Sequence, residues 1–224
     1  MIINYDPTIF NPSFLEEHGN ILHDMYAKVE RVFYEYELPH NVIQEAIHDA
    51  CLFLGLHDVP FDYDNEVCIY TRNPTTYSDD IIGINKEKLF QLDIHNKDNL
   101  SLIMTHETVH GLLQYISATG DLSPWQEELI CDTFMGVRAA VENLSSSRVE
   151  EGLSQTPASD THPYGELRVK YIGIGKEIAE ELLARDLPVS AENILSRIND
   201  YLKSDYDHIH EQEMIHRELS KLRL

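Results

Sequence analysis

The stretch from Asp98 to Ile116 constrains the fold most, because apolar residues occupy nearly every side of the helix that its periodicity predicts. These apolar residues are Leu100, Leu102, Ile103, Met104, Val109, Leu112, Leu113 and Ile116. A helix that is apolar all round belongs in a core, and Asp98 suits its N-cap. Two histidines and a glutamate, His106, Glu107 and His110, lie within about one turn of this helix. Polar groups that are buried without partners cost free energy, so this helix needs something that satisfies them.

The rest of the chain predicts mostly helices with a few short strands. Helical periodicity covers residues 13–37, 41–54, 123–143, 163–184 and 191–202. The start of the third of these is marked by Ser123-Pro-Trp-Gln126, which has the pattern of a capping box. Two strands are expected at Glu66–Thr71 and Asp80–Asn85, around the turn-rich Asn73–Thr76. Residues 145–161 read as a loop and a candidate lid.

A length of 224 residues fits one well-packed domain with extensions. We predict a single domain over residues 1–224. Its parts are N-terminal helices over 1–60, a sheet and site core over 64–172, and C-terminal helices over 173–224.

Composition excludes several kinds of partner. The net charge of −22 repels phosphate backbones and anionic lipids, so neither nucleic acid nor a membrane is an expected partner. No apolar run approaches the ~18 residues that a membrane span needs. The first residues lack the features of a secretory signal, and we expect a cytoplasmic protein. Cys51, Cys68 and Cys131 form no C-x-x-C pair and are expected to be reduced core residues.

The segment His106-Glu-Thr-Val-His110 has the H-E-x-x-H arrangement. Helical residues four apart lie on one face, so both imidazoles can reach a single Zn2+. Glu107 then lies beside the water on that zinc, as a general base. We predict one zinc per chain, and the alternative is a pair of hydrogen-bonded core histidines.

A catalytic zinc usually has three protein ligands. The next predicted helix offers Glu127 and Glu128, which point about 100° apart, so that both cannot face the histidines. Glu128 is the better candidate, because Asp132 follows it by one turn and can accept a hydrogen bond from a ligand imidazole. The alternative for both glutamates is favourable charge near a helix N-terminus.

These motifs resemble the gluzincin metallopeptidases, in which H-E-x-x-H is followed by a helix bearing E-x-x-x-D, here Glu128-Leu-Ile-Cys-Asp132. Asp160-Thr-His-Pro163, with Arg168 after it, looks like the T-H-P…R segment of soluble domains in the prenyl-protease and HtpX-like branch. The small ImmA/IrrE-like peptidases are similar in size. The resemblance covers roughly Ile81 to Tyr171. It implies an α+β, mostly helical, zincin-like (minigluzincin) domain with a small mixed β-sheet beside the H-E-x-x-H helix.

The resemblance also implies roles for residues outside the zinc ligands. An edge strand of the sheet would hold the substrate in extended form, and Ile82, Gly83 and Ile84 are the candidates. An ordinary core strand is the alternative. His162 would donate a hydrogen bond to the oxyanion, or else cap a helix. Arg168 would organise the loop through a carboxylate or contact substrate.

We therefore predict a zinc-dependent endopeptidase that acts on a peptide or protein, with Glu107 as the general base. One alternative is a non-catalytic metal-binding sensor or partner-binding module. The other is a helical interaction protein whose motif is accidental. His208, His210 and His216 lie on a polar C-terminal segment and are expected to be solvated.

Overall fold

The computed structural model describes residues 40–55, 75–78, 81–84, 96–116 and 122–221. The chain divides into two compact units. Asp6–Tyr115 form one, here the N-terminal unit, and Ile116–Leu224 with Met1–Tyr5 form the other, the C-terminal unit. The predicted helix over 13–37 and the predicted strand over 66–71 lie outside the described residues.

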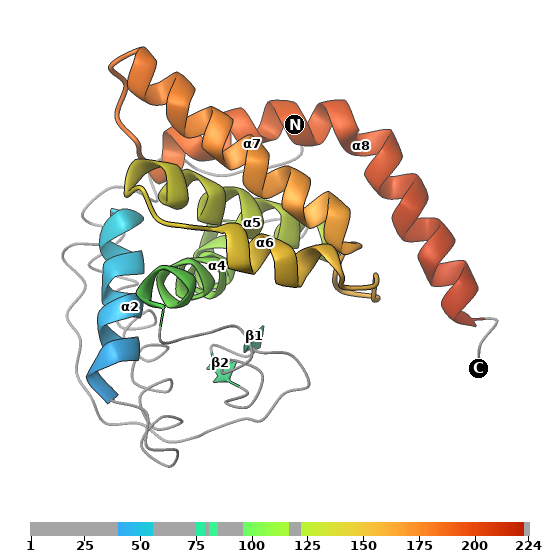
Figure 1. Cartoon of the computed structure of the whole chain (residues 1–224). Helices are drawn as coiled ribbons and strands as arrows, with labels where there is room; N and C mark the ends of the chain where they lie inside the picture. Colours follow the sequence, from blue (N-terminus) through green and yellow to red (C-terminus); the bar gives the residue numbers. More distant parts are fainter. Residues whose placement is uncertain (1–39, 56–74, 79–80, 85–95, 117–121, 222–224) are drawn as a thin grey trace. The chain divides into compact units, whose positions relative to one another are not determined.

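The first helix among the described residues is α2, His40–Phe53, where the sequence predicts a helix over 41–54 (Figure 1). Its buried residues include Ala46, Ala50 and Leu54. The helix ends at a glycine, since Gly55 has a φ of +81° in the left-handed region, where a side chain would be strained.

The strands β1, Thr75–Ser78, and β2, Ile81–Ile84, form an antiparallel hairpin in which Thr75 lies opposite Ile84. Part of the predicted turn is therefore a strand, because Thr and Tyr favour extended backbone. The predicted α+β fold with a small mixed sheet is wrong: the described residues form six helices and this one hairpin. A mixed sheet needs a parallel pair and hence a crossover of a dozen or more residues, whereas only two residues separate β1 from β2.

The helix α4, Lys97–Ile116, confirms the predicted apolar helix. Its cap is Asn96 rather than Asp98, because the Asn96 Oδ1 accepts the Asp98 N–H at 3.0 Å. Fully buried positions include Leu102, Met104 and Val109. This helix carries the H-E-x-x-H segment.

The C-terminal unit contains α5 (Pro124–Val141), α6 (Ser147–Ser154), α7 (Gly165–Ala184) and α8 (Ala191–Lys221). Helix α5 packs against α7 at very short range (Figure 1). A Cβ built at Gly136 of α5 would lie 2.0 Å from the Ile172 carbonyl oxygen, and one at Gly175 of α7 would lie 2.1 Å from that of Thr133. Glycine at both positions lets the two backbones touch, which fixes the side chains on the facing turns.

Helix α5 begins with the predicted capping box. The Ser123 Oγ accepts the Gln126 N–H, and the Gln126 Oε1 accepts the Ser123 N–H. This confirms where the helix begins and sets the rotation of the turns that follow.

The segment predicted as a loop, residues 145–161, contains the short helix α6. Val149 is buried, and Glu150 pairs with Lys176 of α7. Burial would raise the pKa of Glu150, but its hydrogen bonds to Lys176 and Ser146 hold it below the ordinary value. A tertiary contact of this kind stabilises a helix too short to form alone.

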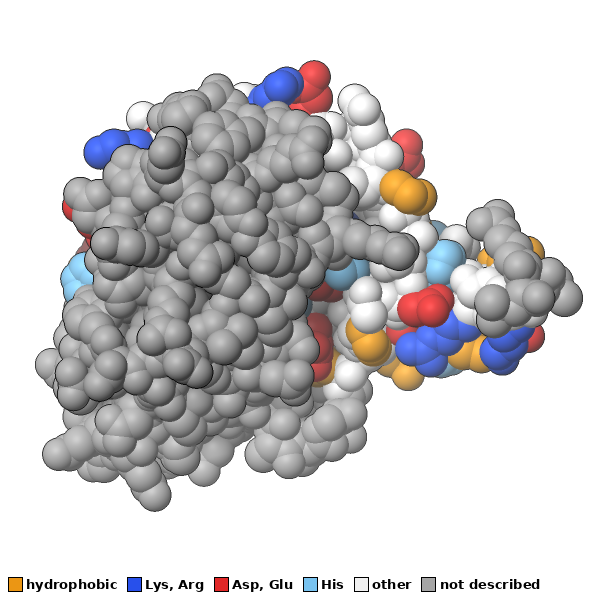
Figure 2. Space-filling view, turned by 90° about the horizontal axis from the view of Figure 1, so that it is seen from below, with side chains coloured by type: hydrophobic (Ala, Val, Ile, Leu, Met, Phe, Trp, Pro, Cys, Tyr) orange, Lys and Arg blue, Asp and Glu red, His pale blue; other side chains and the backbone are white. Residues whose placement is uncertain are grey.

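The second half of α8 mixes exposed apolar and charged side chains, including Tyr206, Met214, Ile215 and Leu219 (Figure 2). Over the described residues, no helix combines the length and the apolar character that a membrane crossing requires.

Candidate metal site and the buried charge cluster

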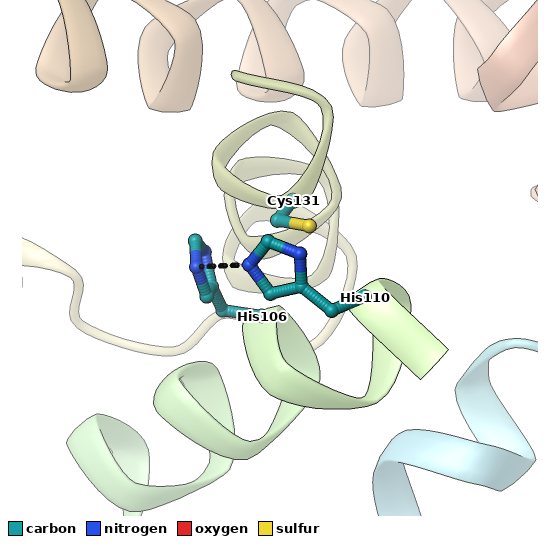
Figure 3. Close-up of side chains that lie close together, drawn as sticks. All are labelled: His106, His110 and Cys131. Atoms are coloured by element: carbon teal, nitrogen blue, oxygen red, sulfur yellow. Dashed lines mark hydrogen bonds between the residues drawn. The ribbon is translucent and has the colours of Figure 1, made fainter. Parts of the chain in front are cut away.

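His106 and His110 of α4 point their rings toward one another (Figure 3). The two Nε2 atoms are 3.2 Å apart, and the ring planes meet at 77°. Two nitrogens bound to one tetrahedral zinc, each at about 2.0–2.1 Å, lie roughly 3.3 Å apart. The observed distance therefore suits shared coordination of one metal, and it also suits a hydrogen bond between the rings.

Glu107, between these histidines in sequence, is only 3 % exposed. Within the part of the chain that the structure describes, its Oε2 is buried and has no hydrogen-bond partner. A buried oxygen left in this state costs roughly 1–3 kcal/mol. The helix therefore carries a polar atom that its own fold does not satisfy.

The C-terminal unit contains a cluster of charged side chains, here called the charge cluster: Glu128 and Asp132 of α5, His162, and Arg168 of α7. The guanidinium of Arg168 donates two hydrogen bonds to Asp132, Nε to Oδ2 at 2.8 Å and Nη2 to Oδ1 at 2.9 Å. The same Nη2 forms an ion pair with the Glu128 Oε2 at 3.1 Å. On the other side, the His162 Nε2 lies 3.3 Å from the Glu128 Oε1.

Most of the charge cluster is buried. Asp132 is 0 % exposed, Glu128 6 % and Arg168 8 %. Burial opposes the charged form of Arg168, but the carboxylates of Asp132 and Glu128 outweigh it and raise its pKa above the ordinary value. The cluster therefore holds one buried cation against two carboxylates.

His162 lies at the exposed edge of the cluster, with 28 % of its side chain accessible. Its Nδ1 lies 2.7 Å from the Thr161 hydroxyl, and its backbone N–H donates to the Ser159 Oγ at 3.0 Å. The Ser159 carbonyl in turn accepts the indole N–H of Trp125 at 3.0 Å. These bonds fix the connection between α6 and α7 onto the start of α5.

The predicted site residues thus fall into two groups. The N-terminal unit contains His106, Glu107 and His110, together with the β2 residues Ile82, Gly83 and Ile84, whose strand is paired on one edge with β1.

The C-terminal unit brings together Glu128, Asp132, His162 and Arg168. Both oxygens of Asp132 accept hydrogen bonds from Arg168, and its predicted role of orienting an imidazole stays a prediction. The ligand role of Glu128 and the oxyanion role of His162 stay predictions.

Cys131 of α5 is a further candidate ligand. The sequence predicts it only as a reduced core residue. Its thiol is fully buried and precedes Asp132 in sequence. Imidazole and thiolate are both donors that zinc prefers, and Figure 3 labels Cys131 as well as the two histidines. A single cysteine without a paired cysteine gives no metal-site signal in a sequence.

The histidines of α8 have aromatic or polar neighbours. His208 lies 3.2 Å from the Tyr164 hydroxyl, His210 stacks on Tyr206, and His216 lies 3.5 Å from a carboxylate oxygen of Asp160. Among the described residues, none of the three belongs to a group that could hold a metal.

Comparison with known proteins adds no relative: no protein-family model, curated protein or solved structure matches this chain. The resemblance to gluzincin peptidases therefore rests on the motifs alone, and the function must be argued from these side chains.

Proposed function

We propose that this chain is a zinc-dependent endopeptidase in which His106 and His110 bind the metal and Glu107 is the general base. The observation that carries the proposal is the pair of facing Nε2 atoms, 3.2 Å apart on one turn of α4. The single turn that presents these two nitrogens also contains the buried Glu107.

Two threonines of α4 show how this helix can satisfy a buried polar group when no ligand is needed. The hydroxyls of Thr105 and Thr108 donate to backbone carbonyls one turn earlier, those of Ser101 and Met104, at 2.8 and 2.7 Å. Among the described residues, no group donates a hydrogen bond to the Glu107 Oε2. A water molecule held on a metal would supply the missing donor, which favours the zinc site over a pair of hydrogen-bonded core histidines.

When bound, zinc supplies a Lewis acid for the scissile carbonyl and lowers the pKa of its water. As the general base, Glu107 would accept a proton from the attacking water and pass it to the leaving amine. The burial of Glu107 suits a general base, because a carboxylate shielded from bulk solvent does not lose the accepted proton to water.

The third ligand is proposed to come from α5. Glu128 remains the first candidate, because Asp132 follows it by one turn of the helix, as the E-x-x-x-D spacing predicts. Cys131 is the second candidate. His162, 28 % exposed, is the proposed donor to the oxyanion.

The proposed substrate is a peptide or protein, held in extended form by Ile82, Gly83 and Ile84 of β2. The cytoplasm is the proposed compartment, in keeping with Cys51 and Cys131 as buried thiols rather than disulfides.

The test is Glu107→Gln in protein purified without a metal-affinity tag. Zinc is measured by mass spectrometry, and turnover is measured on fluorescently labelled, denatured casein. We expect the variant to keep its zinc and to lose about 10²–10⁴-fold in turnover, since a base is lost and a ligand is not. Glu166→Gln, an exposed position on α7, is the control and should change neither.

Two results would reject the peptidase. Zinc without turnover in the unaltered chain would support a metal-binding sensor or partner-binding module instead. Absence of zinc would make the motif accidental.

A further inference from the structure

The imidazole of His162 has polar neighbours at both of its nitrogens, and all of them belong to the C-terminal unit. On one side, Nε2 lies 3.3 Å from the Glu128 Oε1. On the other side, Nδ1 lies 2.7 Å from the Thr161 hydroxyl and 3.3 Å from the Ser159 hydroxyl. A neutral imidazole carries one proton, so one nitrogen donates a hydrogen bond and the other accepts one. These neighbours therefore decide which nitrogen donates.

The Glu128 carboxylate decides the Nε2 side. A carboxylate accepts hydrogen bonds and donates none, so a hydrogen bond between Glu128 and His162 requires the proton on Nε2. With the proton there, Nδ1 of the neutral ring becomes an acceptor. The side chains of Ser159 and Thr161 can satisfy it, because a hydroxyl donates as well as accepts.

The two hydroxyls at Nδ1 are not equivalent. The Ser159 Oγ accepts the backbone N–H of His162 at 3.0 Å, and its distance of 3.3 Å to Nδ1 is long for a hydroxyl donor. The distance of 2.7 Å from the Thr161 hydroxyl is typical of a hydrogen bond from a hydroxyl group. Thr161 is therefore the donor to Nδ1, whereas Ser159 holds the backbone of His162.

The turn that carries Thr161 is attached to α5. The Ser159 N–H donates to the His162 carbonyl at 2.9 Å, which closes the turn. The Ser159 carbonyl accepts the indole N–H of Trp125 at 3.0 Å, and Trp125 is only 1 % exposed. A buried side chain of α5 thus anchors the turn that presents the Thr161 hydroxyl to the imidazole.

We propose that Thr161 is a positioning residue: its hydroxyl donates to Nδ1 of His162 and so keeps the ring proton on Nε2, which makes Nε2 the donor. This inference deepens the proposed function, because a histidine that donates to an oxyanion must carry a proton on the donating nitrogen. Only that use in catalysis rests on the proposed function. The tautomer itself is a property of the C-terminal unit.

The test is NMR of the full chain labelled with nitrogen-15 histidine, at about pH 8.5, above the range in which histidines usually change charge. The shifts of the two ring nitrogens distinguish the tautomers, and His162→Asn identifies the signals of His162. We expect the Nε2–H form to predominate. Thr161→Val should lower the ratio of the Nε2–H form to the Nδ1–H form by about 2–10-fold, the effect of one hydrogen bond on an equilibrium constant. Thr161→Ser should restore the ratio.

Thr156→Val is the matched control. Thr156 is a second exposed threonine of the same connection, but its hydroxyl donates to the Leu153 carbonyl at 2.7 Å. The control should leave the tautomer ratio of His162 unchanged. Ser159→Ala shows which hydroxyl is the donor, since it should change the ratio less than Thr161→Val does. A larger change in Ser159→Ala would overturn the assignment to Thr161.

The outcomes separate this inference from the proposed function. A proton that lies mainly on Nδ1 in the unaltered chain, or an unchanged ratio in Thr161→Val, overturns the positioning role of Thr161 and leaves the peptidase proposal as it stands. Absence of zinc or of turnover in the unaltered chain overturns the proposed function alone, because neither enters the measurement of the tautomer.

Discussion

The buried polar residues of α4 and those of the charge cluster meet the same physical problem with different results. In the cluster, both oxygens of Asp132 accept hydrogen bonds from Arg168, at 2.8 and 2.9 Å. In α4, the Glu107 Oε2 is buried and has no partner among the described residues. A buried carboxylate with both oxygens paired, such as that of Asp132, is explained by the stability of the fold, whereas an oxygen like the Glu107 Oε2 points to a ligand. Substitutions in the two regions should therefore act in opposite directions on stability.

The largest expected effect is that of Asp132→Ala. Removing one partner of a buried ion pair leaves the other charge without compensation, and typically costs about 3–5 kcal/mol. Urea denaturation of the metal-free chain measures the loss. Glu142→Ala, which takes the partner of Arg138, should cost far less, since the Glu142 side chain is 37 % exposed. Equal losses in the free energy of unfolding for the two variants would show that the buried charge cluster contributes no more to stability than a partly exposed ion pair.

The contact of α5 with α7 holds the two halves of the cluster together, and Gly136→Ala tests it. The new Cβ would lie 2.0 Å from a backbone oxygen, so the helices must move apart. We expect a loss of about 1–3 kcal/mol in the free energy of unfolding. Gly173→Ala on α7 is the control, because nothing lies within 4 Å of its added Cβ, and it should be neutral or stabilising. A neutral Gly136→Ala would mean that α5 and α7 do not pack this closely.

Glu107→Gln should raise stability when measured in a chelator. The amide is less costly to bury than a carboxylate without a full set of partners, so the metal-free variant is expected to gain about 1 kcal/mol. The same substitution in the zinc-loaded chain removes turnover, which separates a functional residue from a structural one. A loss of several kcal/mol in the metal-free variant would show that Glu107 serves the fold.

The smallest effect concerns the pair of Glu150 with Lys176, outside both regions. A pKa of Glu150 below its ordinary value near 4.5 means that the pair stabilises the fold above that pH. The contribution disappears as the pH falls through the lowered pKa. Lys176→Met should therefore reduce stability slightly at pH 7 and leave it unchanged once the pH is below the lowered pKa of Glu150. A deficit that persists at low pH would assign the loss to packing of the lysine stem.

The sequence predicts the helices well where local signals are strong. The apolar pattern of α4 and the Ser123 capping box identify two helices that carry candidate residues. The helix α6 and the strand β1 were missed. The contact between Glu150 and Lys176, which stabilises α6, joins residues far apart in sequence. In β1, threonine favours a strand as well as a turn.

The candidate site shows the same limit. Spacing alone places His106 and His110 on one face of a helix, and E-x-x-x-D spacing identifies Glu128 and Asp132. No spacing rule shows that Arg168 would take both oxygens of Asp132, because that bond joins α5 to α7. Cys131 gives no signal in sequence for a similar reason, since its surroundings depend on tertiary packing.

The central claim is that two imidazoles of α4 hold one zinc. X-ray absorption at the zinc edge, on protein purified without a metal-affinity tag, tests it most directly, with zinc content measured on the same sample. We predict one zinc per chain, with nitrogen and oxygen ligands at about 2.0–2.1 Å and an imidazole signature that His106→Ala and His110→Ala remove. A sulfur ligand at about 2.3 Å would keep the claim and replace Glu128 by Cys131. Protein without zinc, or zinc whose spectrum is unchanged in both histidine variants, would contradict it.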